Sequence, residues 1–447
     1  MVVLVYSVCP TRWRNEVLLL ASLCFYAWGA PVFVFVLIAS SALDYIVSKF
    51  IQGAKGVHWL WVGVTANVLT LFVFKYFNFF TENVRAIFHV LGFHFPEYAQ
   101  ILLPLGISFF TFQKISYLID VYRRDTTPAT SFANYLLFVS MFPQLIAGPI
   151  VRYKDIARQL VNRSENDTAE VKLHGFYLLS LGLAQKVLIA DNLAPVVADA
   201  FSNEGHTGAS WLGLIAFTFQ IYFDFSGYSN IAIGLGKLFG FDLPENFRWP
   251  YTAIGFRDFW SRWHITLSTW MRDYLYIPLG GNRGTSAKTI RNLWIVFLLS
   301  GLWHGASWNF VIWGACHGAF LTLDRLTNGF QVLPRVAIGV LTFALVMLSW
   351  VWFRATDLSA ALTYYTQLAD IIHYRLPEIS RVQWAALSVA IVSSFLPSRF
   401  QTMVDVSLSE RSLWKSVAVV LVSALFIVLV LGQLATSASQ PFIYFKF

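Results

Sequence analysis

The feature that most restricts the fold of this chain is a long succession of apolar runs. They cover residues 16–28, 32–51, 57–80, 101–121, 133–151, 173–200, 211–240, 292–303, 308–323, 336–353, 383–396 and 413–437. Only 13% of the 447 residues are charged, whereas soluble domains usually carry about a quarter charged residues. So few charges cannot cover a globular surface, and lipid must be the solvent for much of the chain. The sequence therefore predicts an all-α, multi-pass membrane protein with about ten to twelve membrane helices.

Basic residues gather in the short links between these runs, as in Arg12–Arg14, Lys49–Lys55 and Arg123–Arg124. A net charge of +8 could indicate nucleic-acid binding in a soluble protein. In a multi-pass protein, however, basic links are typical of cytoplasmic loops. We therefore expect membrane lipid, and not nucleic acid, as the partner of these charges.

The chain is interpreted as one domain over residues 1–447, without an internal repeat or a separate soluble part. Glycine and proline interrupt runs such as 101–121 and 133–151, and several runs are too short to cross a membrane alone. Such segments are tolerated where they pack against protein or line a cavity, so we expect re-entrant or interfacial helices around an internal site. The three cysteines have neither disulfide nor zinc spacing: Cys9, Cys24 and Cys316. No metal and no bound cofactor are expected.

Two histidines interrupt the apolar stretch 303–318. A titratable ring at membrane depth is costly, and it marks a functional site by default. Helical spacing places Trp313 one turn before His317, and it places Gly314 and Gly318 one turn apart. Because a stripe of small residues lets a second helix approach closely, we expect His317 to lie in a tightly packed seam as the catalytic centre.

His304 is the other histidine of this stretch. It precedes His317 by thirteen residues, which is about 20 Å along an unbroken helix. Gly305–Asn309 is expected to break the helix, so the two rings can still come close. A buried histidine bonded to a backbone carbonyl is the interpretation preferred for His304.

The stretch Gly255–Tyr274 predicts an amphipathic helix. Its apolar side chains recur with a period of 3.6 residues, and Asp258 and Arg262 form an i,i+4 pair on the polar face. His264 lies on the apolar stripe beside Trp263. The helix is expected to lie in the membrane interface, and a merely structural interfacial histidine is the alternative for His264.

Asp224 lies in the middle of the apolar run 211–240. A carboxylate inside a membrane span requires a partner or a water-filled cavity. It could orient a histidine or hold an arginine. Glycines at 234, 236 and 240 are assigned to helix packing, because no strand precedes them as in a phosphate-binding loop.

Several ordered motifs support a family assignment. They are Tyr222–Ser229, Glu245–Phe247 with Pro250–Tyr251, Phe259–Ser268, Arg272–Tyr276, Gly280–Gly284, Gly301–Gly305, Trp313–Gly314, His317–Gly318 and Phe442–Phe445, preceded by Leu103–Phe109 and Phe142–Pro149. Together they resemble the membrane-bound O-acyltransferase family, in particular its bacterial branch for alginate O-acetylation. The resemblance spans nearly the whole chain and is densest over residues 211–323.

The resemblance implies a many-helix membrane fold with a funnel or tunnel, at whose base a catalytic histidine lies. By motif, the two functional histidines of the family fall on His317 and His264. The remaining candidates for the lining of a substrate tunnel are Asp224, Trp263, Trp313, His304 and Arg262. The family's first helix is longer than Met1–Cys9, so the chain is expected to be clipped at its N-terminus.

The resemblance also implies an activity in the bacterial cytoplasmic (inner) membrane. Acetyl groups would pass from a cytoplasmic donor, expected to be acetyl-CoA, to an extracytoplasmic polysaccharide such as alginate. A partner protein with a serine-esterase-like fold would place them on the polymer. Cellulose, peptidoglycan, teichoic acid and lipid stay open as other acceptors, and a proton-coupled transporter is the alternative from a different class.

Two mechanisms are compatible with these residues. Neutral His317 could act as general base on an acceptor hydroxyl, because the ordinary pKa of histidine lies near working pH and burial favours the neutral ring. A covalent acetyl-histidine relay is the other. In both, His264 would position a substrate or stabilise charge, and Asp224 is a further candidate for this role.

Overall fold

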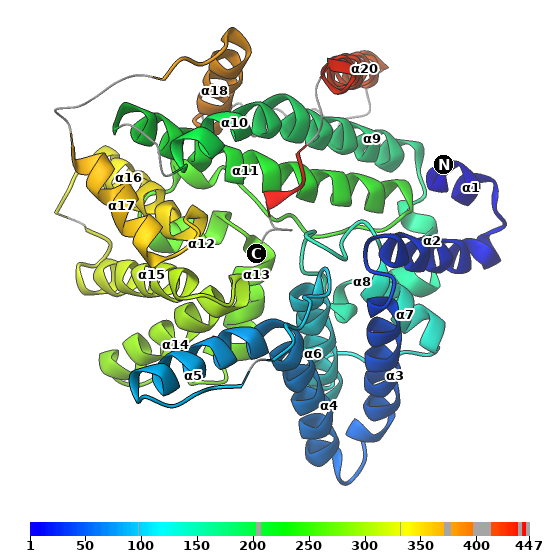
Figure 1. Ribbon diagram of the computed structural model, residues 1–447. Coiled ribbons are helices and arrows are strands. Elements are labelled where there is room, and N and C mark those ends of the chain that lie inside the picture. Colours follow the sequence, from blue (N-terminus) through cyan, green and yellow to red (C-terminus); the bar gives the residue numbers. More distant parts are fainter. Residues whose placement is uncertain are drawn as a thin grey trace. The chain divides into compact units, whose positions relative to one another are not determined.

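A computed structural model describes residues 1–96, 98–202, 207–330, 332–370, 377–396, 413–436 and 440–443. All regular secondary structure within these ranges is helical (Figure 1). The all-α prediction is therefore confirmed for the described part of the chain. The helices form two compact units, Met1–Thr168 with Gly236–Leu243, and Ala169–Leu235 with Pro244–Phe447.

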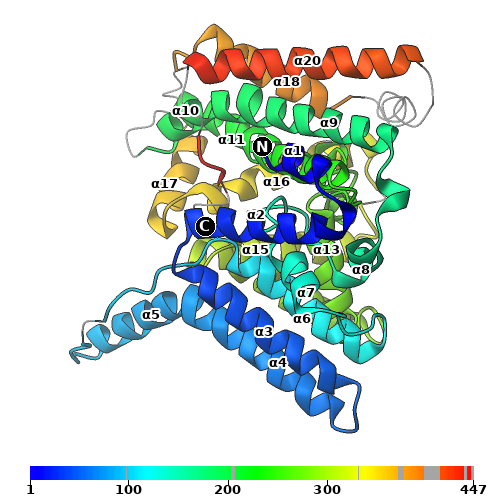
Figure 2. The ribbon, with the colours of Figure 1, turned by 90° about the vertical axis from the view of Figure 1, so that its right-hand side faces the viewer.

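The first unit is built from the N-terminal helices. They are α1 (Val2–Val8), α2 (Arg14–Gly29), α3 (Phe33–Ile51), α4 (Gly56–Leu71), a π-helical turn (Phe72–Tyr76), α5 (Phe77–Val90), α6 (Ile107–Arg123), α7 (Phe132–Ser140) and α8 (Tyr153–Val161). Figure 2 shows α3 and α4 side by side. A buried charge pair helps to hold them to α6: Lys114 lies 3.3 Å from Asp44, and Asn67 donates to the same carboxylate at 2.8 Å. Because a buried charge is stable only with partners, this pair fixes the register of three helices.

The second unit contains the predicted site. Its helices are α9 (Ala169–Ala184), a π-helical turn (Gln185–Ala190), α10 (Asp191–Ala200), α11 (Thr207–Leu238), α12 (Phe256–Arg262), α13 (Ile265–Met271), a second π-helical turn (Arg272–Tyr276), α14 (Ser286–His304), α15 (Trp308–Leu326), α16 (Arg335–Arg354), α17 (Leu358–Ala369), α18 (Arg381–Ser394) and α20 (Leu413–Thr436). The last residues of α11, Gly236–Leu238, belong to the first unit. Helix α20 packs along α9 (Figure 2).

Five helical stretches in the described ranges are long and apolar enough to cross a membrane. They are Phe33–Ile51, Gly56–Val90, Ala169–Ala200, Arg335–Arg354 and Ser416–Thr436. Each overlaps an apolar run recognised in the sequence, although Gly56–Val90 continues beyond the run 57–80, and together they make the chain a membrane protein. The larger number of ten to twelve membrane helices stays a prediction.

Helices α14 and α15 form a close hairpin (Figure 1). A Cβ on Gly314 would overlap the carbonyl oxygen of Phe297, and one on Gly301 would overlap that of Phe310. The two glycines therefore allow the backbones to cross in direct contact, as the small-residue stripe predicted for Gly314. Gly318 differs, because a Cβ there would meet Trp294 at an ordinary 3.5 Å.

Candidate functional site

His317 lies in the middle of α15 and is fully buried. Aromatic rings surround its imidazole. The centroids nearest to it belong to Trp313 at 4.7 Å, Trp260 at 5.1 Å and Phe320 at 5.4 Å. The expected seam is therefore present: the imidazole is enclosed by α12, its own helix and the neighbouring helices, away from water.

The hydrogen bonds of Ser349 assign the tautomer of His317. The Ser349 hydroxyl lies 3.2 Å from Nε2 of His317, and it donates to the carbonyl oxygen of Val346 at 2.6 Å. A hydroxyl has one hydrogen, so its oxygen must accept from the imidazole, and Nε2 carries the proton. Nδ1 has no hydrogen-bond partner among the described residues. The unprotonated nitrogen of His317 is thus the one available to take a proton.

His264 occupies a break between α12 and α13. The predicted continuous amphipathic helix is wrong at this point, because Trp263 is extended and His264 is left-handed with φ of 43°. The backbone on both sides of the break pairs with an upstream segment: Arg248 donates to Arg262, and Ile265 donates to Asn246, each at 2.9 Å. These bonds offset the strain of a non-glycine residue with positive φ.

Asn246 holds the ring of His264. Its Oδ1 lies 3.0 Å from Nδ1 of His264 and also accepts from the hydroxyl of Thr266 at 2.9 Å, while its Nδ2 donates to Ser229 at 3.2 Å. The side-chain oxygen therefore faces the ring, and Nδ1 must be the protonated nitrogen. Nε2 of the buried His264 has no partner in the part of the chain that the structure describes.

His304 and Trp313 lie between the two predicted catalytic rings. The centroids form a row, from His264 to His304 at 6.5 Å, from His304 to Trp313 at 4.9 Å, and from Trp313 to His317 at 4.7 Å. This row exists because α14 ends at His304 and α15 starts at Trp308, as the predicted helix break requires. His264 and His317 are thus joined through two further rings and not by direct contact.

The other candidates lie at different distances from His317. Trp263 stacks on Phe259 at 5.7 Å and contacts Trp350 at 5.0 Å. It therefore packs on aromatic side chains near His317 and not on the imidazole itself. Arg262 pairs with Asp258 at 2.7 Å and is about one-third exposed. The roles of all these residues stay predictions.

Asp224 has a partner that sequence reasoning missed. Lys186, in the π-helical turn after α9, lies 2.6 Å from Asp224 and 2.7 Å from Asp191. The backbone N–H of Ile443 donates to the second oxygen of Asp224 at 2.8 Å. Asp224 therefore anchors the C-terminal segment, and its partners among the described residues include neither a histidine nor an arginine. A lysine within the apolar run 173–200 was the available signal, since intramembrane charges need partners.

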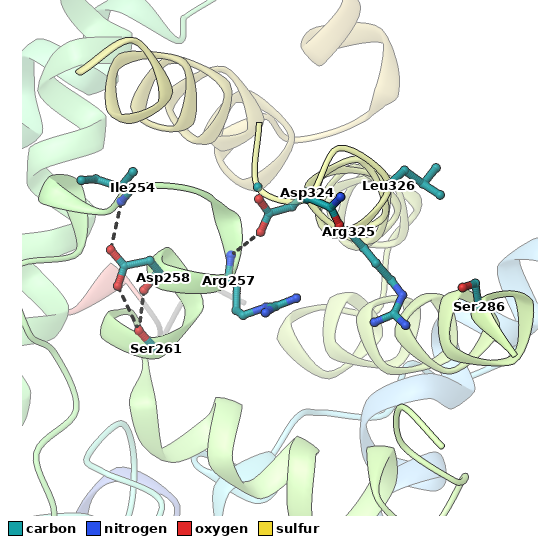
Figure 3. Close-up of a pocket in the computed structure, with 10 residues that line it drawn as sticks. Ile254, Arg257, Asp258, Ser261, Ser286, Asp324, Arg325 and Leu326 are labelled. Atoms are coloured by element: carbon teal, nitrogen blue, oxygen red, sulfur yellow. Dashed lines mark hydrogen bonds between the residues drawn. The ribbon is translucent and has the colours of Figure 1, made fainter. Parts of the chain in front are cut away.

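A cavity of about 980 Å³ opens at the C-terminal end of α15 (Figure 3). Its lining includes Arg257, Asp258 and Ser261 from the α12 region, Ser286 at the start of α14, and Arg325. The Asp324 carboxylate accepts from the backbone N–H of Arg257 at 3.1 Å and so joins α12 to α15. The guanidinium groups of Arg257 and Arg325 form no ion pair within the described residues.

A second cavity, of about 670 Å³, opens at the other end of α15. Its lining combines polar side chains from four parts of the chain, Gln220, Ser307, Arg354 with Thr356, and Gln440, with apolar ones such as Phe310. Ser307 precedes His317 by ten residues and Asp324 follows it by seven, or about 15 Å and 10 Å along the helix. His317 therefore lies between two cavities. No cluster of three potential metal ligands occurs in the described ranges.

These features define a helical membrane protein with a buried histidine between two cavities. The model of the membrane-bound O-acyltransferase family matches residues 126–367. A protein of Azotobacter vinelandii, named "Probable alginate O-acetylase AlgI", is 43% identical over 395 residues, which are 86% of this chain and 78% of the relative. A protein of the same name from Pseudomonas putida is 39% identical over 470 residues, 99% of this chain and 96% of its own. A peptidoglycan O-acetyltransferase of Helicobacter pylori is 40% identical over 390 residues, 79% of this chain and 72% of its own.

The chain belongs to the membrane-bound O-acyltransferase family. It is therefore an enzyme that transfers an acyl group to an oxygen atom, and it does so as a membrane protein.

Proposed function

We propose that this enzyme transfers acetyl groups from acetyl-CoA on the cytoplasmic side of the bacterial inner membrane toward an extracytoplasmic polysaccharide. The observation that carries the proposal is the position of His317, a buried base with a free Nδ1 between two cavities at opposite ends of one helix. A donor entering one cavity and an acceptor entering the other would meet at this ring. The funnel or tunnel of the proposal consists of these two cavities and the aromatic rings between them.

The cavity at the C-terminal end of α15 suits the donor. Figure 3 shows Arg257 in the α12 region and Arg325 on α15, and both side chains line this cavity. Unpaired arginines bind phosphate oxygens strongly, and the nucleotide part of acetyl-CoA carries several. The adjoining loop and the first turns of α14 carry Arg283, Lys288 and Arg291, which favours the cytoplasmic side for this end.

The cavity at the N-terminal end of α15 suits the acceptor. Its amides and hydroxyls can bind sugar hydroxyls, and Arg354 adds one cation without an ion pair within the described ranges. The names of the relatives support O-acetylation of alginate or of peptidoglycan. An acidic polymer such as alginate fits Arg354 better. A serine-esterase-like partner would carry the acetyl group from this side to the polymer.

In the proposed reaction His317 is the general base. Nδ1 removes the proton of the acceptor hydroxyl as its oxygen attacks the thioester carbonyl carbon, and the intermediate then expels the CoA thiolate, which takes up the proton. Nε2–H stays bonded to Ser349 throughout. His264, reached through His304 and Trp313, would position the acceptor or stabilise charge.

The experiment uses the full chain in inverted membrane vesicles supplied with radiolabelled acetyl-CoA. Oligomannuronate and peptidoglycan strands are offered inside the vesicles in separate samples, each together with the serine-esterase-like partner protein. We expect incorporation of label into the first acceptor, and a loss of at least about 10³-fold in His317→Ala, as for removal of a general base with its positioning role. His89→Ala, on α5 in the other unit, is the matched control.

Four results would change the proposal. Undiminished transfer by well-expressed His317→Ala would remove His317 from the mechanism. Label in peptidoglycan alone would move the acceptor to the class of the Helicobacter relative. Proton flux without any acetyl transfer would favour the transporter. Ping-pong kinetics would favour an acetyl-histidine intermediate over the general base.

A further inference from the structure

Three tryptophans in the second unit bury indole N–H groups that have no hydrogen-bond partner among the described residues: Trp260, Trp313 and Trp350. Trp313 and Trp350 are 0% and 1% exposed, and Trp260 is 9% exposed. A buried donor without a partner costs about 1–3 kcal/mol. Native proteins contain few such groups, and each one calls for an explanation. By contrast, Trp211 of the same unit donates to the carbonyl of Leu368 at 2.9 Å.

Two of the three unpaired indoles touch the predicted base. The rings of Trp313 and Trp260 lie 4.7 Å and 5.1 Å from that of His317, come from different helices, and are inclined to each other by 71°. Neither N–H bonds to Nδ1 of His317, which likewise has no hydrogen-bond partner among the described residues. The third indole, Trp350, stacks on Trp313 at 6.0 Å, and no ring contact joins it to His317.

Contacts with aromatic faces do not account for these donors. Trp260 meets the rings of His317 and Phe297 edge to face, and an N–H directed at a π face is a weak hydrogen bond. A carbonyl oxygen carrying negative charge is a far better acceptor. Two fixed donors beside a base, all three unsatisfied, are the arrangement required where a carbonyl oxygen becomes an oxyanion.

We propose that the indole N–H groups of Trp260 and Trp313 form the oxyanion site of the acyl transfer at His317. The inference rests on the proposed function, because it assigns donors for the same reaction. The site would accept the carbonyl oxygen of a thioester, and its two donors would bind the tetrahedral intermediate more tightly than the substrate.

The step balances as follows. The acceptor oxygen forms a bond to the thioester carbonyl carbon while its proton moves to Nδ1 of His317. The π electron pair of the carbonyl moves onto its oxygen, which the two indole N–H groups stabilise. The pair then returns, the carbon–sulfur bond breaks, and the proton passes from the imidazolium to the leaving thiolate. An ester and a free thiol result, and no oxidant or reductant is needed.

The test replaces each N–H without changing the ring. In 3-benzothienylalanine, sulfur stands where the indole has N–H, so shape and burial are kept and only the donor is lost. We expect Trp313→3-benzothienylalanine and Trp260→3-benzothienylalanine to lower kcat by about 10²-fold each, the usual effect of removing one oxyanion donor. KM for acetyl-CoA should stay within about twofold, because the donor acts in the transition state. Trp350→3-benzothienylalanine is the matched control, and its kcat should stay near that of the wild type.

The outcomes separate the two proposals. If the Trp260 and Trp313 variants both have the kcat of the wild type, and the wild type transfers acetyl groups, the oxyanion site is overturned and the proposed function stands. An equal loss in the Trp350 variant would overturn it too, since that loss would reflect packing. Wild-type protein that transfers no acetyl group would overturn the proposed function and the oxyanion site together. Size-exclusion profiles of the variants establish that each one is folded.

Discussion

At the scale of single residues, each predicted catalytic ring donates a hydrogen bond to a side-chain oxygen, that of Ser349 for His317 and that of Asn246 for His264. The Ser349 hydroxyl donates to the carbonyl oxygen of Val346, and the amide nitrogen of Asn246 donates to the hydroxyl of Ser229. Each of these oxygens can therefore only accept a hydrogen bond from the histidine ring. The consequence is a fixed tautomer for each ring, in which Nδ1 of His317 and Nε2 of His264 have no hydrogen-bond partner among the described residues. A base must present the correct nitrogen before its pKa matters.

Replacement of Ser349 by alanine should weaken the preference of His317 for one tautomer. We expect Ser349→Ala to lower kcat about 5- to 10-fold, the equivalent of one lost hydrogen bond of about 1 kcal/mol. Nitrogen-15 spectra of the histidines should show a mixture of His317 tautomers in this variant. Ser349→Thr should restore both rate and spectrum, because threonine can make the same helical back-bond.

A buried serine without a histidine partner is the control. Ser180 donates to the carbonyl of Phe176 at 2.7 Å within α9, and Ser180→Ala should leave the rate unchanged. An unaltered tautomer in Ser349→Ala would contradict the assignment, whatever its effect on rate.

At the scale of helices, the α14–α15 hairpin places the site. Its two backbones cross in contact at Gly301 and Gly314, and the turn Gly305–Ser307 returns the chain so that His304 packs on Trp313. Because backbone atoms cannot move aside as side-chain ends can, the crossing cannot accept even one methyl group without separating the helices.

The two glycines flanking His317 should therefore respond differently to alanine. Gly314→Ala places a methyl group against the carbonyl of Phe297 and should destabilise the protein by about 1–3 kcal/mol. Gly318→Ala meets Trp294 at 3.5 Å and should be tolerated. Thermal unfolding in detergent measures both. Equal melting temperatures for the two variants would show that the crossing is less tight than described.

The apolar runs predicted most helices closely, since hydrophobic length alone selects them. For example, the run 308–323 became Trp308–Leu326, and 336–353 became Arg335–Arg354. The helix over residues 255–274 was predicted wrongly at His264, because periodicity reports side chains and cannot detect backbone pairing with residues 246–248. The partner of Asp224 was missed for a related reason: Lys186 lies 38 positions away, and no local pattern joins the two.

At the scale of the whole second unit, the buried position of His317 could be predicted and the cavities could not. His317 stands in a recognisable motif, and its seam glycine is one turn away in sequence. The lining of each cavity comes from separate segments, such as Arg257 with Arg325, or Gln220 with Arg354 and Gln440. Only the folded arrangement brings these charges together. The two cavities differ in their arginines: Arg257 and Arg325 line the one at the C-terminal end of α15, together with Asp258 and Asp324, whereas Arg354 lines the other.

This asymmetry predicts which arginines recognise the donor. Arg257→Gln and Arg325→Gln should each raise KM for acetyl-CoA about 10-fold, because one charge-assisted bond to phosphate is lost, and kcat should change little. The increase in KM should shrink at high salt, which already screens such contacts. Arg283→Gln, on the adjoining loop but outside the cavity lining, is the control for a general loss of positive charge.

A second substrate distinguishes phosphate binding from damage to the site. The N-acetylcysteamine thioester of acetate has the reacting thioester of acetyl-CoA but no phosphate. Its KM should be the same for the wild type and for both arginine variants, since the lost contacts are absent from this substrate. If the variants impair both donors equally, Arg257 and Arg325 act on the shape of α12 and α15 and not on the nucleotide. The donor would then have to enter through the cavity that contains Arg354, and the proposed direction of transfer would be reversed.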